Sequence, residues 1–579
     1  MDGKRTHSLP SVWPLSLRIA AAALGLILSH AALLVSAPWA EQLLKMLSRT
    51  QFLPAGIAIA TASVSWLAAG FLPVLLATAL LGRIYCSVLC PLGITQDILV
   101  FLGGKIRRRR FGRSPIDPLR RRLVHLAVAM LSIVSFAAGL TLLVNLLEPY
   151  AFWGRMERDL ILPAAAGVSL MVSEGLKLID LFVAPIPFHG HLPVVAVTAA
   201  LFIALLSVTL WRGRWFCNTL CPTGALLRLP ALVPGLPLLR IHADEERCTL
   251  CGVCEKVCKT GSIAVNADAV RIDVESCVVC FVCSSGCPFD ALRFSRPDAK
   301  GRGMNESGEV SGSRESRGVG AGRGMNESGG RRERGGSAKK GEHAFSTGRR
   351  EFLKRSGMSI GGAVGGTSLF TAVLPGTYRG LFALRASGPE GRPNRPATPP
   401  GSKSLARFHA TCISCHTCVA ACPTHVLQPS LFEYGLDGFM QPVMDYGTGY
   451  CEFECSSCLN VCPVGAILPL SLKEKQKTQI GKVQFIKDRC VIFSQGTACG
   501  ACAEVCPTGA VWMVPYRPHL TQPETDNDIG VGCGNCEYAC PVEGGKAIYV
   551  RGNEVHVERE VREKEKSGPE LAEPEEFPF

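Results

Sequence analysis

The sequence predicts an α-helical membrane bundle of four spans plus an internal signal-anchor, joined to small cysteine-rich α+β domains. Hydropathy predicts the spans and cysteine spacing predicts the small domains. The chain has 579 residues, 47% of them hydrophobic, and its mean hydropathy is +0.22. These values are too apolar for a soluble protein that also carries a polar linker, so membrane spans are expected. The 27 cysteines stand almost entirely in Cys-x2-Cys, Cys-x3-Cys and Cys-Pro spacings.

The cysteine spacing predicts iron–sulfur clusters in preference to disulfides or zinc. Disulfide frameworks belong to small secreted domains without large cores. The spacing Cys-x2-Cys-x2-Cys-x3-Cys-Pro is instead that of bacterial ferredoxins, so the small domains are expected to be ferredoxin-like. Seven clusters with four ligands each would need one thiolate more than the 27 present. We therefore expect up to seven clusters, mostly [4Fe–4S], one of them with an incomplete cysteine set.

Four apolar segments are long enough to cross a bilayer, at residues 19–37, 57–81, 123–147 and 192–211. Each has roughly 19–25 residues, which suffices for a hydrocarbon core of about 30 Å. Residues 160–183 contain charges and are expected to form an interfacial helix, with a fifth span as the alternative. The Lys and Arg residues concentrate at 105–122, which predicts that the N-terminus and this loop are cytoplasmic. We expect no nucleic-acid partner, because topology accounts for the basic run.

Two matched cysteine pairs follow directly on predicted spans. One stands in Gly82-Arg-Ile-Tyr-Cys-Ser-Val-Leu-Cys-Pro and the other in Gly213-Arg-Trp-Phe-Cys-Asn-Thr-Leu-Cys-Pro. Neither pair can complete a cluster alone, so one shared cluster is predicted at the cytoplasmic face, with ligands Cys86, Cys90, Cys217 and Cys221. Residues 15–290 resemble the membrane (NapH-type) subunit of the quinol-oxidising systems that supply periplasmic nitrate reductase. They also resemble polyferredoxin-like membrane proteins related to nitrous-oxide reductase regulators.

A two-cluster ferredoxin module follows. Its two runs are Cys248, Cys251, Cys254 and Cys258, and Cys277, Cys280, Cys283 and Cys287. In the usual crossed arrangement, the fourth cysteine of each run ligates the cluster of the other run. Lys259 stands where a proline is expected after the first run, while Pro288 follows the second. Residues 262–265 and 270–274 are expected to form short strands between the motifs.

Four more cysteine motifs lie between residues 405 and 557. The complete ones are Cys412, Cys415, Cys418 and Cys422; Cys451, Cys455, Cys458 and Cys462; and Cys490, Cys499, Cys502 and Cys506. The fourth has only Cys533, Cys536 and Cys540, with Gly530 where its first ligand is expected. We expect there a four-iron cluster with Asp526, Asp528 or solvent on one iron; a [3Fe–4S] cluster and no cluster are the alternatives. The spacing leaves open whether the motifs pair first with fourth or in sequence.

This part resembles the ferredoxin (NapG-type) subunit of the same systems, and Gly530 departs from that pattern. A segment that resembles a twin-arginine export signal precedes it, with Arg349, Arg350, Phe352, Leu353 and Lys354. A mildly apolar, glycine-rich stretch follows, without a clear cleavage site, so an uncleaved anchor is expected. Export of a folded domain through the Tat translocase would protect thiolate ligands from oxidation.

The predicted organisation has seven parts. They are a membrane domain at 1–240, a ferredoxin module at 241–297, a disordered linker at 298–344, a signal or anchor at 345–386, a second linker at 387–404, a polyferredoxin domain at 405–557 and an acidic tail at 558–579. The protein is expected in the cytoplasmic (inner) membrane. Residues 241–297 are expected in the cytoplasm and residues 405–579 in the periplasm.

The resemblance implies a fusion of the two subunits, with electron transfer from quinol to a periplasmic reductase and the quinol dehydrogenase activity that this entails. Glu148, Arg155 and Asp159, at the outer end of the third predicted span, are the candidates for handling quinol protons. One alternative is a transmembrane conduit fed by a cytoplasmic ferredoxin. The other is a factor that senses redox state or helps a metalloenzyme to mature. The terminal acceptor, the quinone type and the direction of electron flow are open.

Overall fold

The computed structural model describes residues 13–296 and 395–559, apart from gaps at 35–37, 62–69, 108–117, 140, 178–179, 181, 183–189, 234 and 437. The predicted linker at 298–344, the signal at 345–386 and most of the acidic tail lie outside the described residues. The described residues contribute to one large hydrophobic core, which includes side chains from both the helical and the C-terminal cysteine-rich regions. A second, smaller core lies within the ferredoxin module.

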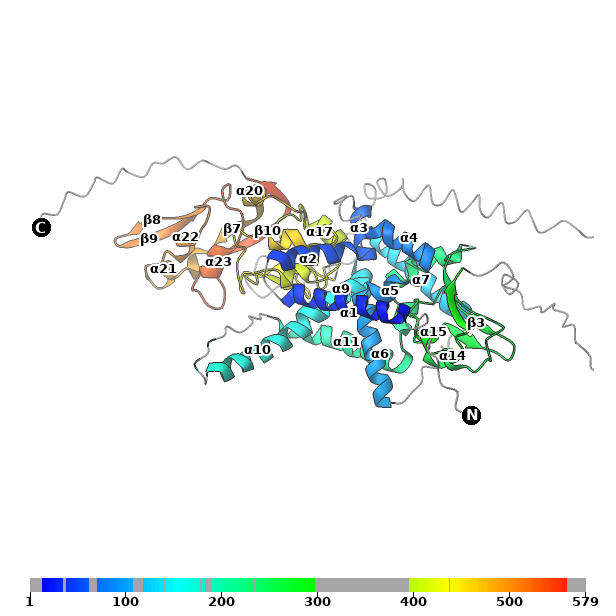
Figure 1. The fold of residues 1–579 in the computed structure, drawn as a ribbon. Coiled ribbons are helices and arrows are strands. Elements are labelled where there is room, and N and C mark those ends of the chain that lie inside the picture. Colours follow the sequence, from blue (N-terminus) through cyan, green and yellow to red (C-terminus); the bar gives the residue numbers. More distant parts are fainter. Residues whose placement is uncertain are drawn as a thin grey trace, which may run out of the picture. The chain divides into compact units, whose positions relative to one another are not determined.

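The N-terminal region is helical throughout its described length (Figure 1). Its α-helices are α1 (Trp13–Leu34), α2 (Pro38–Arg49), α3 (Phe52–Ala60), α4 (Phe71–Leu81), α5 (Tyr85–Val88), α6 (Pro91–Arg107), α7 (Pro118–Ala137), α8 (Leu142–Leu147), α9 (Pro149–Met156), α10 (Leu162–Lys177), α11 (Leu192–Arg212), α12 (Trp215–Thr219) and α13 (Pro222–Leu226). A π-helical turn, η2 (Glu157–Ile161), joins α9 to α10, and a 3-10 turn, η3 (Leu229–Leu232), follows α13.

Three helical runs among the described residues are long and apolar enough to cross a membrane: Pro14–Leu33, Pro149–Lys177 and Leu192–Arg212. The first and third coincide with predicted spans. The expected span at 123–147 is interrupted, because α7 ends at Ala137 and α8 begins at Leu142. Of the expected span at 57–81 only the two ends are described, in α3 and α4, because residues 62–69 lie outside the described residues. Residues 160–177, expected to lie at the interface, instead continue the 29-residue run that starts at Pro149. This run overlaps residues 160–183, for which a fifth span was the alternative to an interfacial helix, but it begins earlier.

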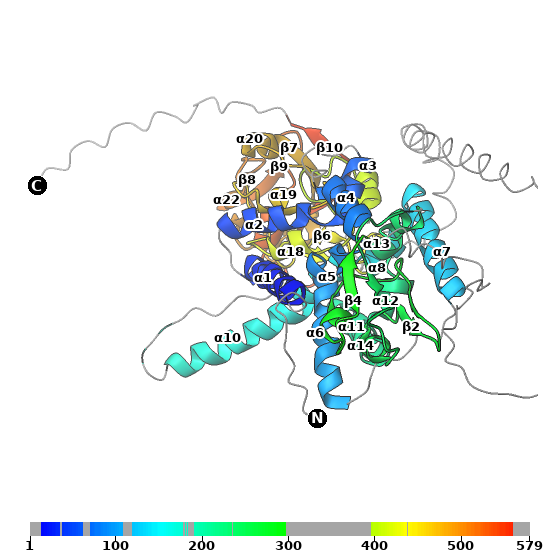
Figure 2. The same cartoon turned by 45° about the vertical axis from the view of Figure 1, so that its right-hand side comes forward.

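The ferredoxin module has two short helices, α14 (Val253–Val257) and α15 (Val282–Ser285), and two antiparallel strand pairs (Figure 2). Strand β1 (Arg240–Ala243) pairs with β4 (Leu292–Ser295). The other pair is β2 (Ile263–Val265) with β3 (Val270–Ile272), at the two segments that the sequence predicted. Each helix begins inside a cysteine run. The two strand pairs connect the segments around these helices and so hold the two runs side by side.

The C-terminal region builds its motifs around three further two-stranded sheets. The sheets are β5 (Leu427–Pro429) with β6 (Pro442–Met444), β7 (Thr478–Phe485) with β10 (Ile548–Glu558), and β8 (Val511–Arg517) with β9 (Leu520–Thr525). The helices are α17 (Leu405–Thr411), α18 (Thr417–Ala420), α19 (Ser457–Val461), α20 (Leu472–Lys477), α21 (Val491–Ser494), α22 (Ala501–Glu504) and α23 (Asn535–Ala539), with the 3-10 turn η5 (Lys487–Arg489).

Residues 395–404 belong to this domain and not to a linker. Gly552 N donates to Arg395 O at 2.9 Å and Met444 N donates to Ala397 O at 3.2 Å. The side chain of Thr398 is buried and lies 2.9 Å from His556 Nε2. The domain therefore extends to residue 395, ahead of the boundary at 405 that its composition predicted.

Candidate iron–sulfur centres and the polar contacts around them

The two membrane cysteine pairs meet in the fold. Cys86, Cys90, Cys217 and Cys221 are all buried, and all four interact electrostatically with one another. In each motif the second cysteine precedes a helix that begins with proline, and its sulfur accepts the hydrogen bond of an orphan amide at the helix N-terminus. Gly93 N donates to Cys90 Sγ at 3.4 Å, and Gly224 N donates to Cys221 Sγ at 3.3 Å. Such bonds stabilise thiolate, the form that ligates iron.

The arginine of each membrane motif reaches across to the other motif. Arg83 Nη2 donates to Cys217 O at 3.0 Å, and Arg214 Nη1 donates to Cys86 O at 2.8 Å. Both side chains are fully buried. The glycine after each Cys-Pro pair is required for this arrangement, because a Cβ atom at Gly93 would collide with Cys86 O and one at Gly224 with Cys217 O. Each motif therefore binds the backbone of the other through its arginine.

Asp97 connects this centre to the ferredoxin module. Its Oδ1 accepts from Arg214 Nε at 2.8 Å and lies 3.3 Å from Lys259 Nζ, and its Oδ2 contacts Arg18. The backbone of Lys259 also takes part, because Arg214 N donates to Lys259 O at 2.9 Å. Lys259, which stands where the motif expects proline, thus holds the module against α6.

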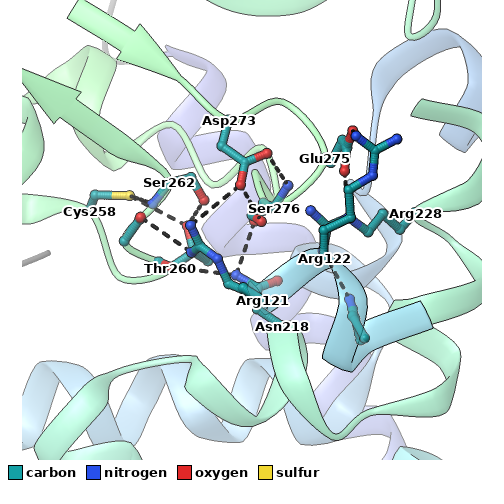
Figure 3. A network of polar contacts seen from close by, with 12 residues as sticks. Arg121, Arg122, Asn218, Arg228, Cys258, Thr260, Ser262, Asp273, Glu275 and Ser276 are labelled. Carbon is teal, nitrogen blue, oxygen red and sulfur yellow. Dashed lines mark hydrogen bonds and ion pairs between the residues drawn. The ribbon is translucent and has the colours of Figure 1, made fainter. Parts of the chain in front are cut away.

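Further ion pairs join α7 and Arg228, which lies between α13 and η3, to the module (Figure 3). Arg121 Nη2 lies 3.5 Å from Asp273 Oδ2, and Arg228 Nε lies 2.7 Å from Glu275 Oε2. Asn218 Nδ2 donates to the carbonyl oxygens of two module residues that adjoin the cysteine runs, at 3.3 and 3.4 Å. Arg121, one of the basic residues from which the topology was predicted, therefore pairs with an acidic residue of the module.

The module's eight cysteines fall into two groups, each lining its own cavity. One cavity is lined by Cys248, Cys251, Cys254 and Cys287, and the other by Cys258, Cys277, Cys280 and Cys283. This is the grouping that crossed ligation requires. Burial raises the pKa of the Cys277 thiol to about 12. Thiolate in such a place needs the charge compensation that bound iron supplies.

The backbone between these cysteines has the geometry of a loop wrapped around a common centre. The second residue after the first cysteine and the residue after the second cysteine have positive φ, in Val279 (51°) and Phe281 (60°) and again in Ser414 (55°) and His416 (57°). L-residues rarely adopt this conformation. Its repetition in side chains of such different kinds points to a requirement of the site, and these loops fit a cluster.

In the C-terminal domain, the first cysteine motif pairs with the second and the third with the fourth. Cys412, Cys415, Cys418 and Cys462 line one cavity, and Cys422, Cys451, Cys455 and Cys458 line the next. Cys490 and Cys502 interact electrostatically with Cys499 and Cys540. Cys506, Cys533 and Cys536 line a further cavity together with Gly530. Neither Asp526 nor Asp528, expected as substitute ligands, is among the residues that line it.

The three candidate quinol residues lie in a buried polar cluster between α8 and η2. Glu148 caps α9 by accepting from Ala151 N with Oε2, while its Oε1 has no hydrogen-bond partner among the described residues. Burial raises the pKa of Glu148 to about 7, against hydrogen bonds from the N–H groups of Ala151 and Tyr150. Arg155 interacts electrostatically with both Glu148 and Asp159. The sequence prediction therefore named residues that the fold does bring together.

This cluster contacts the first C-terminal cysteine loop. Asp159 Oδ2 lies 3.3 Å from Nδ1 of His416, which stands between two cysteines of that loop, and accepts from Thr198 Oγ1 at 2.8 Å. A Cβ atom at Gly154 would collide with Cys415 O, so α9 and the loop are in close contact. On its other side, Glu148 interacts electrostatically with Tyr85, which also interacts with Cys90. Glu148 thus lies between two groups of thiols.

Comparisons with known proteins agree with this geometry. A 4Fe-4S binding domain model matches residues 63–110 and 194–238, and another matches 241–264. Two 4Fe-4S dicluster domain models match 411–467 and 450–510. The methylamine utilization ferredoxin-type protein MauM of Methylophilus methylotrophus is 30% identical over 168 residues, which is 26% of this chain and 70% of that protein. The chain belongs to the ferredoxin-type iron–sulfur proteins.

Two Nap proteins are also similar to this ferredoxin-type protein. The ferredoxin-type protein NapF of Escherichia coli K12 is 28% identical over 156 residues, 27% of this chain and 86% of that protein. The ferredoxin-type protein NapG of Haemophilus influenzae is 29% identical over 217 residues, 34% of this chain and 70% of that protein. No solved structure matches. Together the domain matches and the cysteines support several iron–sulfur clusters and a role in electron transfer.

Sequence reasoning missed the side chains that hold the membrane centre of this ferredoxin-type protein. It noted the repeated Gly-Arg before each cysteine pair but assigned it no role. It also passed over Asp97 and over Gln96, whose Oε1 accepts from Cys217 Sγ at 3.0 Å. The available signal was the exact repetition of Gly-Arg and Cys-Pro-x-Gly in both motifs.

Proposed function

We propose that this protein takes electrons from quinol in the membrane and passes them through its iron–sulfur clusters to a periplasmic reductase. The observation that carries this proposal is Glu148, a buried acid with one unpartnered oxygen between two groups of thiols. Oxidation of a quinol to a quinone releases two electrons and two protons, so the site needs a proton acceptor beside an electron acceptor. A carboxyl group with a pKa of about 7 suits the first role.

The neighbours of Glu148 extend the site. Trp153 Nε1, about one helical turn along α9, is also buried, and the described part of the chain offers it no hydrogen-bond partner. Arg155 donates to the carbonyl oxygens of Asn145 and Leu146, which fixes the turn that presents Glu148. Bound clusters supply one-electron transfer, while these side chains orient the substrate and take up its protons.

Helix α11 supports a transmembrane arrangement. His191, just before its first residue, lies 3.5 Å from Asp445 of the C-terminal domain. Arg214, just after its last residue, bonds to Lys259 of the ferredoxin module. The 21 residues of α11 correspond to roughly 30 Å at 1.5 Å per residue, about the thickness of a hydrocarbon core. A module at each end of this helix fits a cytoplasmic module and a periplasmic polyferredoxin domain.

The test is anaerobic reduction of the full chain in detergent by a menaquinol analogue, followed by low-temperature EPR. Wild type should show rapid reduction of its clusters. Glu148→Gln should slow quinol-driven reduction at least tenfold and leave reduction by dithionite unchanged. Glu174→Gln, a matched change at an exposed position of α10, should behave as wild type. Reduction by dithionite but not by quinol in wild type would contradict the proposal.

A cytoplasmic ferredoxin as electron donor is the second candidate. It is favoured by the outward face of the module, where Cys251 is exposed and Phe289 is 49% exposed beside the same cavity. A soluble donor could approach this cavity directly. Rapid reduction by a low-potential ferredoxin in a wild type that quinol leaves oxidised would select this candidate, and Phe289→Ala should then slow it.

A further inference from the structure

The cavity of the third and fourth C-terminal motifs has three thiols but the backbone of a complete site. Cys506, Cys533 and Cys536 line it. Gly532 (φ 77°) and Gly534 (φ 79°) hold the positions, relative to Gly530, that Val279 and Phe281 hold relative to Cys277. The loop therefore retains the wrapped conformation of the complete motifs although its first ligand is absent from the sequence.

Within the described residues, no side chain of the cavity lining replaces the missing thiol. Besides the three cysteines, the cavity is lined by glycines, aliphatic side chains, Pro507 and Thr508. Asp526 Oδ1 accepts from Asp528 N at 2.8 Å, and Asp528 is exposed. Thr508 Oγ1 is 3.7 Å from Cys506 Sγ, a position beside an existing ligand and not at the empty corner.

The corner at Gly530 is buried, which decides between the cluster types. Gly530 and its neighbour Val531 are both buried, and an ideal Cβ at Gly530 would lie 3.4 Å from Ala510 Cβ and from Asp526 O. Each iron of a four-iron cluster needs a terminal ligand. An iron at this corner would face the Ala510 methyl group and Asp526 O, a carbonyl oxygen that already accepts a hydrogen bond from Gly530 N at 3.2 Å. Solvent has little access there, and an iron without a terminal ligand in such surroundings is unfavourable.

We propose that Cys506, Cys533 and Cys536 hold a [3Fe–4S] cluster whose missing iron corresponds to the corner at Gly530. Three thiolates satisfy all three irons of such a cluster. The inference rests on the proposed electron-transfer function only in that the C-terminal cysteines bind clusters. It takes up the [3Fe–4S] alternative in place of the expected four-iron cluster with Asp526, Asp528 or solvent on one iron.

This cluster would be an internal relay. Cys451 N, in the second motif, donates to Cys533 O at 2.9 Å. Cys536 interacts electrostatically with Cys502 of the neighbouring four-thiol group. The three-thiol site thus lies between two complete ones, and cluster type is one of the factors that set reduction potential.

The test is EPR of the anaerobically purified full chain, poised oxidised. An oxidised [3Fe–4S] cluster is paramagnetic, whereas an oxidised [4Fe–4S] cluster is diamagnetic, so wild type should give a single spin per chain. Gly530→Cys, whose Cβ meets only ordinary contacts, should abolish this signal and raise the iron content by one atom. Gly530→Ser, the matched variant without a thiol, should retain the signal.

Two further variants keep the test decisive if Gly530→Cys does not fold. Cys533→Ser should lose the signal, and Asp528→Asn, which changes an exposed carboxylate outside the cavity lining, should retain it. A wild type without the signal, or a signal that persists in folded Gly530→Cys, would overturn the inference. Quinol-driven reduction of the other clusters, measured on the same samples, separates this failure from failure of the proposed function.

Discussion

Arg83 and Arg214 hold equivalent places in the two membrane motifs, but only Arg214 is neutralised by a carboxylate. Arg214 pairs with Asp97 at 2.8 Å. Among the described residues, the acceptors of Arg83 are the Asn218 side chain and two carbonyl oxygens, with Cys86 Sγ at 4.0 Å. The charge of Arg83 is therefore left to interact with the thiolate centre, where unit charges about 4 Å apart interact by about 4 kcal/mol at an effective dielectric constant of about 20.

Replacing Arg83 with Gln should make the membrane centre harder to reduce, because reduction adds negative charge that Arg83 stabilises. We expect at least a tenfold shift in the reduction equilibrium, about 59 mV more negative for a one-electron couple. Arg83→Lys, which retains the charge, should shift the potential less. An EPR-monitored redox titration of the full chain measures both variants, and an unchanged potential in Arg83→Gln would refute a role for this charge.

The pH dependence of quinol oxidation should report Glu148. Because burial raises its pKa to about 7, the carboxylate that accepts a proton is present above that pH and disappears below it. The initial rate of quinol-driven reduction should rise through pH 7 in wild type and be flat in Glu148→Gln. Stopped-flow absorbance at several pH values measures this, and an identical rise in the variant would show that another group titrates.

At this scale the sequence predicted which cysteines form each site but not what surrounds them. The spacing of the ligands is local in the sequence, so the two cysteine groups of the module could be predicted from its two cysteine runs. Arg83 and Cys217, by contrast, are 134 residues apart, and only the folded chain brings them together. The close contact between α9 and the Cys415 loop could not be predicted either, because Gly154 and this loop are far apart in the sequence.

The elements show where composition misleads. Residues 395–404 are rich in proline and glycine, as linkers are, yet their backbone groups pair with β10 and with Met444, the last residue of β6. The expected span at 123–147 was read as continuous because its side chains are largely apolar. The break after Ala137 falls at a single glycine, Gly139 (φ 77°), which does not stand out within an apolar run.

The contact between residues 398–404 and β10 should weaken in acid. Burial lowers the pKa of His556 to about 4 from 6.5, so the folded state favours neutral imidazole. The stability from this effect is full above pH 6.5 and is lost as pH falls toward 4. Amide hydrogen exchange of β10 in the full chain should accelerate over this range in wild type.

The variant His556→Gln should remove this acid sensitivity, while His519→Gln, at an exposed turn between β8 and β9, should leave it in place. If β10 exchanges faster in acid to the same extent in His556→Gln, then titration of His556 is not the cause.

For the whole molecule, the contacts arrange the thiol groups in a series. The module contacts the membrane centre through Lys259 and Asp97. The membrane centre is linked through Tyr85 and Glu148 to Cys415. Beyond the group of Cys415 lie, in order, the group lined by Cys422 and Cys451, the three-thiol site at Cys533, and the group that contains Cys490 and Cys540. This order fits electron transfer from one side of a membrane to the other.

Export of the C-terminal domain should depend on the proposed signal at Arg349 and Arg350, which lies outside the described residues. Changing both arginines to lysine retains the charge but should prevent recognition by the Tat translocase. Residues 405–579 should then be protected from protease added to spheroplasts, whereas they are digested in wild type. Changing Arg331 and Arg332 to lysine, in the preceding linker, is the matched control. Digestion in the double-lysine variant would show that another signal exports the domain.

The most direct test of electron flow from quinol to the outer domain uses the full chain in sealed vesicles. Their bilayer holds a menaquinol analogue, and a membrane-impermeant oxidant is added outside, where the C-terminal domain of correctly oriented molecules is accessible. Wild type should oxidise the quinol at the expense of the external oxidant, and Cys412→Ser should block this by at least tenfold. Quinol that stays reduced in wild-type vesicles, while a low-potential donor inside still delivers electrons to the external oxidant, would contradict quinol oxidation and leave a conduit fed from the cytoplasm.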